Sequence, residues 1–82
     1  MYQIEWLEPV YELYAELPTK DRIEIQKRLT LLERFPDLYP LRHTGHFRGL
    51  RYFVAGRWIV YYRHVGDTIF VRALWPARIP YS

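Results

Sequence analysis

The strongest pattern in the chain is the alternation of apolar and cationic residues between positions 49 and 78. Residues 57–65 and 68–75 are rich in β-branched and aromatic side chains, and the dipeptide Gly66-Asp67 separates them. Because such a dipeptide suits the two-residue turn of a β-hairpin, the pattern predicts two antiparallel strands. A third strand over residues 50–54 completes a three-stranded meander.

The predicted hairpin register gives the sheet one apolar face and one arginine-bearing face. The apolar face is expected to hold Trp58, Val60 and Tyr62 with Val71, Ala73 and Trp75. The other face is expected to hold Arg57, Ile59, Tyr61 and Arg63 with Phe70, Arg72 and Leu74. The face of Arg51 stays open, because a two-residue turn at Ala55-Gly56 places it on the apolar side and a three-residue turn on the arginine side.

The first half of the chain predicts one strand and two helices. Residues 1–7 alternate apolar and polar side chains, as expected of a half-buried strand at a sheet edge. A short helix follows, begun by Pro9 and ended by Pro18. Its apolar positions recur at the helical period: Val10, Leu13, Tyr14 and Leu17.

A second helix is predicted over residues 20–35, with Thr19 as its N-cap and Pro36 as its terminator. Its apolar stripe comprises Ile25, Leu29 and Leu32, supported by Ile23 and Phe35. Residues 36–48 carry two prolines and no clear period, so they are expected to form a loop.

This order of elements predicts an α+β fold: an N-terminal strand, a helical hairpin, then a three-stranded antiparallel meander. The hairpin is expected to cover the apolar face of an antiparallel sheet, which leaves the other face partly open. With 82 residues, the chain has room for one domain, taken as residues 1–82.

Composition narrows the classes of function. There are no cysteines, which excludes disulfides, thiolate metal sites and cysteine nucleophiles. No apolar run is long enough to span a membrane, and the N-terminus lacks a signal peptide, so a cytoplasmic protein is expected. No motif for a cofactor is present.

Charge is distributed unevenly along the chain. Residues 1–41 hold 5 Lys or Arg against 8 Asp or Glu, whereas residues 42–82 hold 7 arginines against Asp67 alone. Arginine binds phosphates and carboxylates through a rigid fork and stacks on flat rings. The second half therefore predicts a surface for an acidic or polyanionic partner, although a merely solvated basic face fits the same pattern.

Histidine is the residue type that exchanges protons near neutral pH. His43 and His46 lie in an arginine-flanked loop and are candidates for a catalytic base, although a surface role is the commoner one. Their spacing also fits a metal pair, but no third ligand lies near in sequence. His64 is predicted to be a partly buried, hydrogen-bonded residue.

From position 49 onward the sequence resembles the RelE/ParE superfamily of toxins from bacterial type II toxin–antitoxin modules. The resemblance is carried by Gly49-Leu50-Arg51, by Gly56-Arg57-Trp58-Ile59-Val60-Tyr61-Tyr62-Arg63, by Gly66-Asp67, and by Arg72-Ala73-Leu74 with Arg78. It implies a small cytoplasmic, growth-inhibiting toxin of the kind associated with plasmid stabilisation, silenced by a cognate antitoxin in a hetero-oligomer. No membrane partner is implied.

The two branches of the superfamily differ in target: RelE-like toxins cleave mRNA in the ribosome, and ParE-like toxins inhibit DNA gyrase. The spacing from Arg51 to Arg72 looks more like ParE. The RelE pattern prefers basic residues near Tyr52, Val54 and Ile59, where this chain has none. The sequence thus favours gyrase inhibition, with mRNA cleavage as the alternative and a non-toxic basic binding module as a third.

The needs of RNA cleavage and the positive charge of the sheet suggest the site residues. For a nuclease these are Arg51, Arg78, Tyr81 and His46, with the C-terminal Arg78 and Tyr81 similar to the end of RelE. For antitoxin or target binding they are Arg51, Arg57, Arg63, Arg72 and Arg78.

Overall fold

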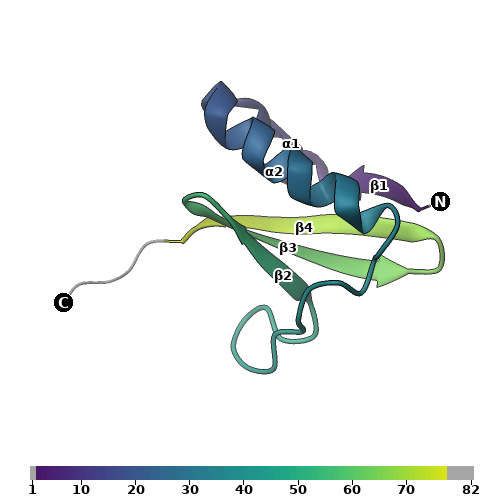
Figure 1. Cartoon of the computed structure of the whole chain (residues 1–82). Helices are drawn as coiled ribbons and strands as arrows, with labels where there is room; N and C mark the ends of the chain where they lie inside the picture. The colour runs from purple at the N-terminus through teal and green to yellow at the C-terminus, as the bar shows by residue number, and fades with distance from the viewer. Residues whose placement is uncertain (1, 78–82) are drawn as a thin grey trace.

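The computed structural model describes residues 2–77, and Figure 1 shows two helices on one side of a four-stranded sheet. The elements in chain order are β1 (Gln3–Trp6), α1 (Glu8–Ala15), α2 (Thr19–Leu32), β2 (Arg51–Ala55), β3 (Trp58–Val65) and β4 (Thr68–Pro76). The predicted order of one strand, two helices and three strands is confirmed, as is the α+β class.

The sheet is mixed rather than antiparallel throughout. Its strand order is β1-β4-β3-β2, in which β1 runs parallel to β4 while the other pairs are antiparallel. The helical hairpin between β1 and the meander forms the crossover that a parallel pair requires. The prediction of a half-buried edge strand is confirmed for β1, because Tyr2, Ile4 and Trp6 pack against the core.

The β3–β4 hairpin contains a bulge that the sequence pattern did not predict. The turn at Gly66-Asp67 pairs Tyr62 with Val71 as expected, but the next pair is Tyr61 with Ala73, so Arg72 is the extra residue. Beyond this point β4 is shifted by one position, and a one-residue shift exchanges the faces of the sheet.

The bulge corrects three of the face assignments. Leu74, which was predicted on the arginine face, pairs with Val60 and lies in the core. Trp75, which was predicted in the core, pairs with Ile59 and is 53% exposed. Ala73 is buried, but it lies opposite Tyr61 rather than in the core cluster.

The helices follow the predicted pattern, with corrections at their ends. Thr19 is the first residue of α2 rather than its N-cap, and its hydroxyl accepts a hydrogen bond from Arg22 Nη2 at 3.1 Å. The stripe of Ile25, Leu29 and Leu32 is fully buried, as predicted. Ile23 and Phe35 are each more than half exposed, so their predicted support of this stripe is wrong.

The β2–β3 turn decides the face of Arg51. Ala55 pairs with Trp58, so the turn residues are Gly56 and Arg57, one position later than predicted. Gly56 has a φ of 60°, which suits a hairpin turn with glycine first. This two-residue turn pairs Arg51 with Tyr62 and thus places Arg51 on the side of the helices.

The loop between α2 and β2 begins on the helix side, where Tyr39 packs against the core, and its later part passes below the sheet, on the side away from the helices (Figure 1). Its end is fastened to the edge of β2 by a bridge between Leu41 and Arg51 and by a hydrogen bond from Arg42 N to Leu50 O at 2.7 Å. In the described part of the chain, neither helix is long and apolar enough to cross a membrane.

Candidate functional site

The candidate site lies on the face of the sheet opposite the helices. The register places a set of side chains there, on what we call the open face; they include Glu5, Tyr52, Val54, Ile59, Tyr61, Arg63, Phe70, Arg72, Ala73 and Trp75. The prediction that this face would be left without helical cover is confirmed.

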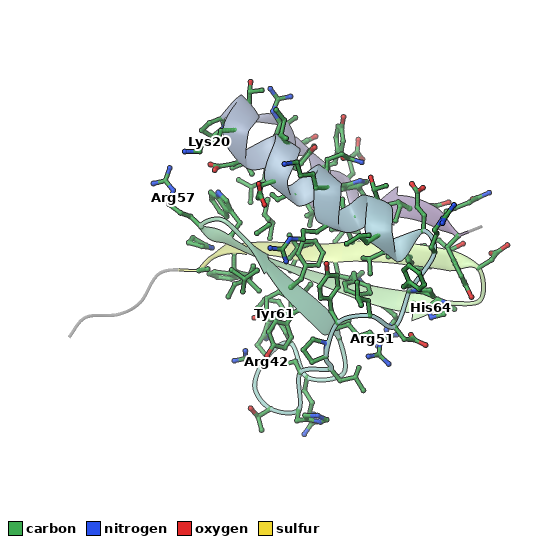
Figure 2. The ribbon with its side chains drawn as sticks, in the orientation of Figure 1. Lys20, Arg42, Arg51, Arg57, Tyr61 and His64 are labelled. Carbon is green, nitrogen blue, oxygen red and sulfur yellow. The ribbon has the colours of Figure 1, made fainter. Side chains whose placement is uncertain are left out.

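A loop covers the middle of the open face. The ring of Phe47 stacks on Tyr61 with centroids 4.1 Å apart and planes inclined by 22°, and it meets Trp75 edge-on at 6.0 Å. Because of this cover Tyr61 is only 3% exposed, whereas Trp75 keeps half of its surface in solvent. Figure 2 shows Tyr61 and Arg42 together on this side of the sheet.

Beside Phe47 the open face has a depression of about 320 Å³ that is rich in cations, which we call the cationic depression. Its lining residues are Leu7, His46, Phe47, Arg48, Leu50, Arg63 and Arg72. None of these lining residues, within the described range 2–77, is acidic. Three arginines and one histidine therefore line the depression, from β3, the β4 bulge and the loop.

The β4 bulge helps to form the cationic depression. Arg72 is the inserted residue of β4, and it lines the same depression as Arg63 of β3. Bulges commonly re-aim a side chain beside functional sites. Here the bulge keeps Arg72 on the open face while it turns Leu74 into the core.

A second depression of about 490 Å³ adjoins the first and shares His46 and Phe47 with it; we call it the aromatic depression. It is lined by Arg42, His46, Phe47, Ile59, Tyr61, Trp75 and Pro76. A cationic hollow suits a phosphate or carboxylate, and exposed flat rings suit a nucleobase or an apolar side chain. The two together fit a ligand that is both anionic and flat.

Arg51 belongs to a different cluster, on the helix side. Its Nη1 donates to the carbonyl of Tyr39 at 2.7 Å, and its Nε lies 3.3 Å from Oδ1 of Asp37. The same carboxylate oxygen lies 3.1 Å from His64 Nδ1, and His64 Nε2 lies 2.9 Å from the carbonyl of Gly66. We call Asp37, Arg51 and His64 the helix-side clamp, because they fasten the loop after α2 to the sheet.

The helix-side clamp contains two residues, His64 and Arg51, for which the sequence made predictions. The prediction of a partly buried, hydrogen-bonded His64 is confirmed. Arg51, a predicted catalytic and binding residue, lies on the opposite side of the sheet from Arg63 and Arg72 and is engaged by loop groups.

Tyr62 lies next to the clamp and is fully buried, with its hydroxyl donating to the carbonyl of Pro36 at 3.1 Å. Burial raises the pKa of Tyr62 to about 12, because the phenolate would lose its hydration. Burial also raises the pKa of Tyr14, whose hydroxyl lies 3.3 Å from Gln26 Oε1. Both groups are packing residues and lie away from the open face.

The remaining predicted site residues are scattered. Arg57 lies in the β2–β3 turn rather than on a strand face, so it does not join Arg63 and Arg72. Arg78 and Tyr81 lie outside the described residues.

The two loop histidines differ in position. His46 lines both depressions and meets Phe47 edge-on at 4.9 Å. His43 is exposed and lines neither of them. Within residues 2–77, no three metal-ligating side chains gather at one place.

Sequence reasoning missed Arg48, Phe47 and Trp75 as site residues. No sequence pattern singled out Phe47 or Arg48, and Trp75 was predicted to lie in the core. The one available signal was the pair of glycines, Gly45 and Gly49, both with positive φ, which bracket Arg48 and shape the loop that returns to the sheet.

No family model matches the sequence, and no curated protein matches it. Solved structures do match. The isolated E. coli RelE toxin superposes with a TM-score of 0.83 at 15% identity, covering 98% of this chain and 88% of that chain.

Two further structures widen the comparison. The archaeal RelE–RelB complex from Pyrococcus horikoshii OT3 matches with a TM-score of 0.69 at 20% identity, over 93% of this chain and 94% of the other. The chromosomal ParDE system of P. aeruginosa matches with a TM-score of 0.64 at 15% identity, over 95% and 98%. The chain has the RelE/ParE toxin fold. At these identities the likeness concerns the fold, and function has to be argued from the site.

Proposed function

We propose that this chain is the toxin of a type II toxin–antitoxin module and that it acts on RNA through the open face. One observation supports this proposal most: three arginines and a histidine meet in the cationic depression, next to the aromatic depression. Single-stranded RNA offers the matching pattern, a phosphate beside an unstacked base.

Binding follows from the chemistry of the two depressions. A phosphate of the RNA lies among Arg48, Arg63 and Arg72, where each charge-assisted contact contributes roughly 1.5–3 kcal/mol. The adjacent base lies against the exposed ring of Trp75, which is 53% exposed. Phe47 separates the two subsites and borders both.

Cleavage in this proposal uses the 2′-hydroxyl of the bound nucleotide. His46 accepts the proton of that hydroxyl, and the 2′ oxygen attacks the neighbouring phosphorus. The bond from phosphorus to the 5′ oxygen breaks, giving a 2′,3′-cyclic phosphate and a 5′-hydroxyl that takes its proton from water. The guanidinium groups of Arg63 and Arg72 stabilise the charge that develops on the phosphate oxygens.

A cognate antitoxin is the proposed regulator. The structures that share this fold include a RelE–RelB complex and a ParDE system, in which a toxin chain is found with its partner. An acidic segment of the antitoxin would neutralise the cationic depression and exclude RNA from it. Of the five arginines predicted to bind the antitoxin, we propose Arg63 and Arg72 for this contact, together with Arg48, because these three line one depression.

Gyrase inhibition is the second candidate, and a separate observation favours it. Tyr52, Val54 and Ile59 lie on the open face, so the end of this face at the β2–β3 turn carries no cation on a strand. An apolar, aromatic surface of that kind suits a protein partner better than a phosphate backbone.

Induction of the chain without its partner tests the proposal. Primer extension maps the ends of messages, and a supercoiling assay with purified gyrase runs in parallel. We expect growth arrest with new message ends, both lost in a variant that carries Arg63→Ala and Arg72→Ala. A matched variant with Arg28→Ala and Arg34→Ala, on and just after α2, should keep both effects.

Each contrary outcome has a distinct meaning. Intact messages with blocked supercoiling would replace the nuclease by the gyrase inhibitor. Normal growth on induction, with no antitoxin gene beside this one, would leave a non-toxic binding module and refute the toxin.

A further inference from the structure

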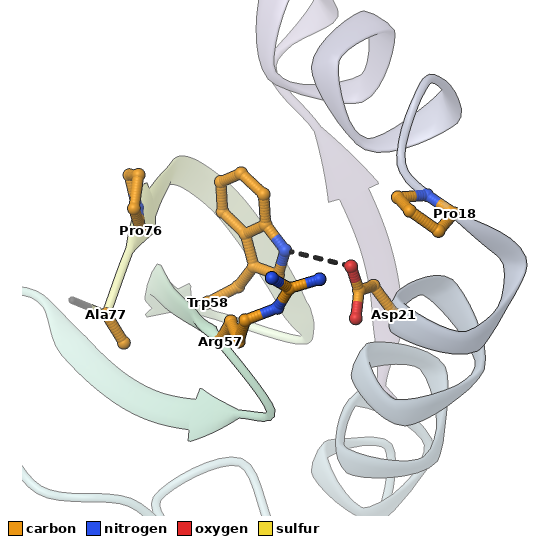
Figure 3. Close-up of a pocket in the computed structure, with 6 residues that line it drawn as sticks. All are labelled: Pro18, Asp21, Arg57, Trp58, Pro76 and Ala77. Carbon is orange, nitrogen blue, oxygen red and sulfur yellow. Dashed lines mark hydrogen bonds between the residues drawn. The ribbon is translucent and has the colours of Figure 1, made fainter.

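A separate depression lies on the helix side of the sheet, where the β2–β3 turn meets the start of α2 (Figure 3). It measures about 380 Å³ and is lined by Pro18, Asp21, Arg57, Trp58, Pro76 and Ala77. We call it the Trp58 pocket. It shares no residue with the cationic depression, and Trp58 points to the opposite side of the sheet from Tyr61.

The walls of the pocket are fixed by contacts between three segments of the chain, residues 18–21, 57–58 and 76–77. Trp58 Nε1 donates to Oδ2 of Asp21 at 3.3 Å, which ties the indole to the first turn of α2. Trp58 lies opposite Pro76 in the register, and Ala77 N donates to the carbonyl of Arg57 at 2.7 Å. A pocket held in this way needs little reorganisation to receive a ligand.

The pocket combines an apolar interior with a basic mouth. Pro18, Trp58 and Pro76 give it apolar walls, and an indole ring flanked by prolines suits a large apolar side chain. Arg57 lies at the mouth, and Lys20 projects from the start of α2 at the same end of the molecule (Figure 2). Among the described residues that line the pocket, Asp21 is the acidic one, and its carboxylate accepts the hydrogen bond of the indole.

We infer that the Trp58 pocket binds an acidic segment of a partner protein, with one large apolar side chain inserted against Trp58. Its flanking carboxylates lie against Arg57 and Lys20. The apolar walls disfavour a nucleic-acid backbone here, whereas an amphipathic acidic peptide satisfies both the apolar interior and the basic mouth of the pocket. The inference does not depend on the proposed toxin function, because the pocket lies on the other side of the sheet.

The test uses a capped nonapeptide with a central leucine flanked by glutamates and aspartates. It is titrated at low ionic strength into the isotope-labelled full chain, and the indole N–H signals of Trp6, Trp58 and Trp75 are followed by NMR. We expect a saturable shift of the Trp58 indole signal, whose proton lies in the bond to Asp21, while the signals of Trp6 and Trp75 stay in place.

Two changes separate the apolar and ionic parts of the interaction. Arg57→Glu should weaken binding by about five- to ten-fold, while the matched reversal Arg34→Glu at the far end of α2 should leave it unchanged. A peptide with serine in place of the central leucine should lose the Trp58 shift. Trp58→Phe keeps a ring in the pocket, and a well-dispersed spectrum of that variant confirms folding.

Other results would overturn the inference. Shifts confined to Arg63 and Arg72 would place acidic peptides on the open face instead. Equal binding of the serine peptide would reduce the effect to surface charge, and tighter binding of a short single-stranded RNA at Trp58 would make the pocket a nucleic-acid site.

Discussion

Arginine and histidine occur on both sides of the sheet, but their surroundings differ: on the helix side they bond to other groups of the chain, whereas on the open face they line a depression. In the helix-side clamp, Arg51 and His64 share the carboxylate of Asp37 and also bond to loop carbonyls. In the cationic depression, no hydrogen bond or ion pair within residues 2–77 joins the guanidinium groups of Arg48, Arg63 or Arg72 to a carboxylate or carbonyl of the chain.

This difference separates structural cations from available ones. An arginine whose donors are occupied by its own chain stabilises the fold, and removing it leaves partners unsatisfied. When arginines without internal partners lie close together, their mutual repulsion destabilises the folded chain. An anionic ligand that binds among them removes this repulsion and stabilises the folded chain. The comparison predicts that variants of the clamp change stability and variants of the depression change function.

The largest effect is expected from the double variant Arg63→Ala and Arg72→Ala. Loss of two charge-assisted phosphate contacts should weaken binding of a short single-stranded RNA about 100-fold or more, with little change in thermal stability. Fluorescence anisotropy and a melting curve measure the two quantities. A large drop in melting temperature would show that these arginines are structural and would erase the distinction between the two sides.

The next effect is a loss of stability in alkali that depends on Tyr62. Because the folded pKa of Tyr62 is raised to about 12, its contribution is fully present below the pKa of the unfolded chain and is lost as the pH rises from about 10 to about 12. The loss amounts to at most about 2.7 kcal/mol.

Urea titrations at pH 9 to 12 measure this loss, and Tyr62→Phe should flatten the curve over that range. Tyr14, whose pKa is also raised by burial, leaves a smaller residual slope in the same direction. An unchanged slope in Tyr62→Phe would show that another group controls the alkaline transition.

A smaller effect is expected for Arg51→Ala. The side chain is 25% exposed and holds the carbonyl of Tyr39 and the carboxylate of Asp37, so its loss should lower the free energy of unfolding by about 1–2 kcal/mol. Urea denaturation measures this quantity. RNA affinity of the folded variant should be unchanged, and a large loss of affinity at full stability would restore Arg51 to the functional surface.

The smallest effect is expected for Asp37→Asn. Its carboxylate is 62% exposed, and exposed ion pairs contribute about 0–1 kcal/mol. The variant should therefore be less destabilised than Arg51→Ala and should respond weakly to added salt. A loss larger than that of Arg51→Ala would mean that the bond to His64, rather than the bond to Arg51, holds the clamp together.

The local sequence pattern was sufficient to predict the strands, the helices and much of the core. The alternation in residues 1–7, the helical period of Ile25, Leu29 and Leu32, and the glycine of the Gly66-Asp67 turn each depend on neighbours in sequence, and each prediction is confirmed. The division of charge between the two halves also pointed correctly to the sheet as the cationic part of the molecule.

Tertiary structure decided which arginines share a site. No local pattern in the sequence marks the extra residue at Arg72. This bulge places Leu74 in the core and Trp75 on the open face. The return of the 42–49 loop brings Arg48 and His46 beside Arg63, across long separations in sequence. The position of the β2–β3 turn sets the register of β2, and this register places Arg51 on the helix side of the sheet, where it bonds to the loop carbonyl of Tyr39. Sequence thus determined which residues are charged and which elements carry them, while register and loop packing, which depend on distant contacts, decided which charges meet.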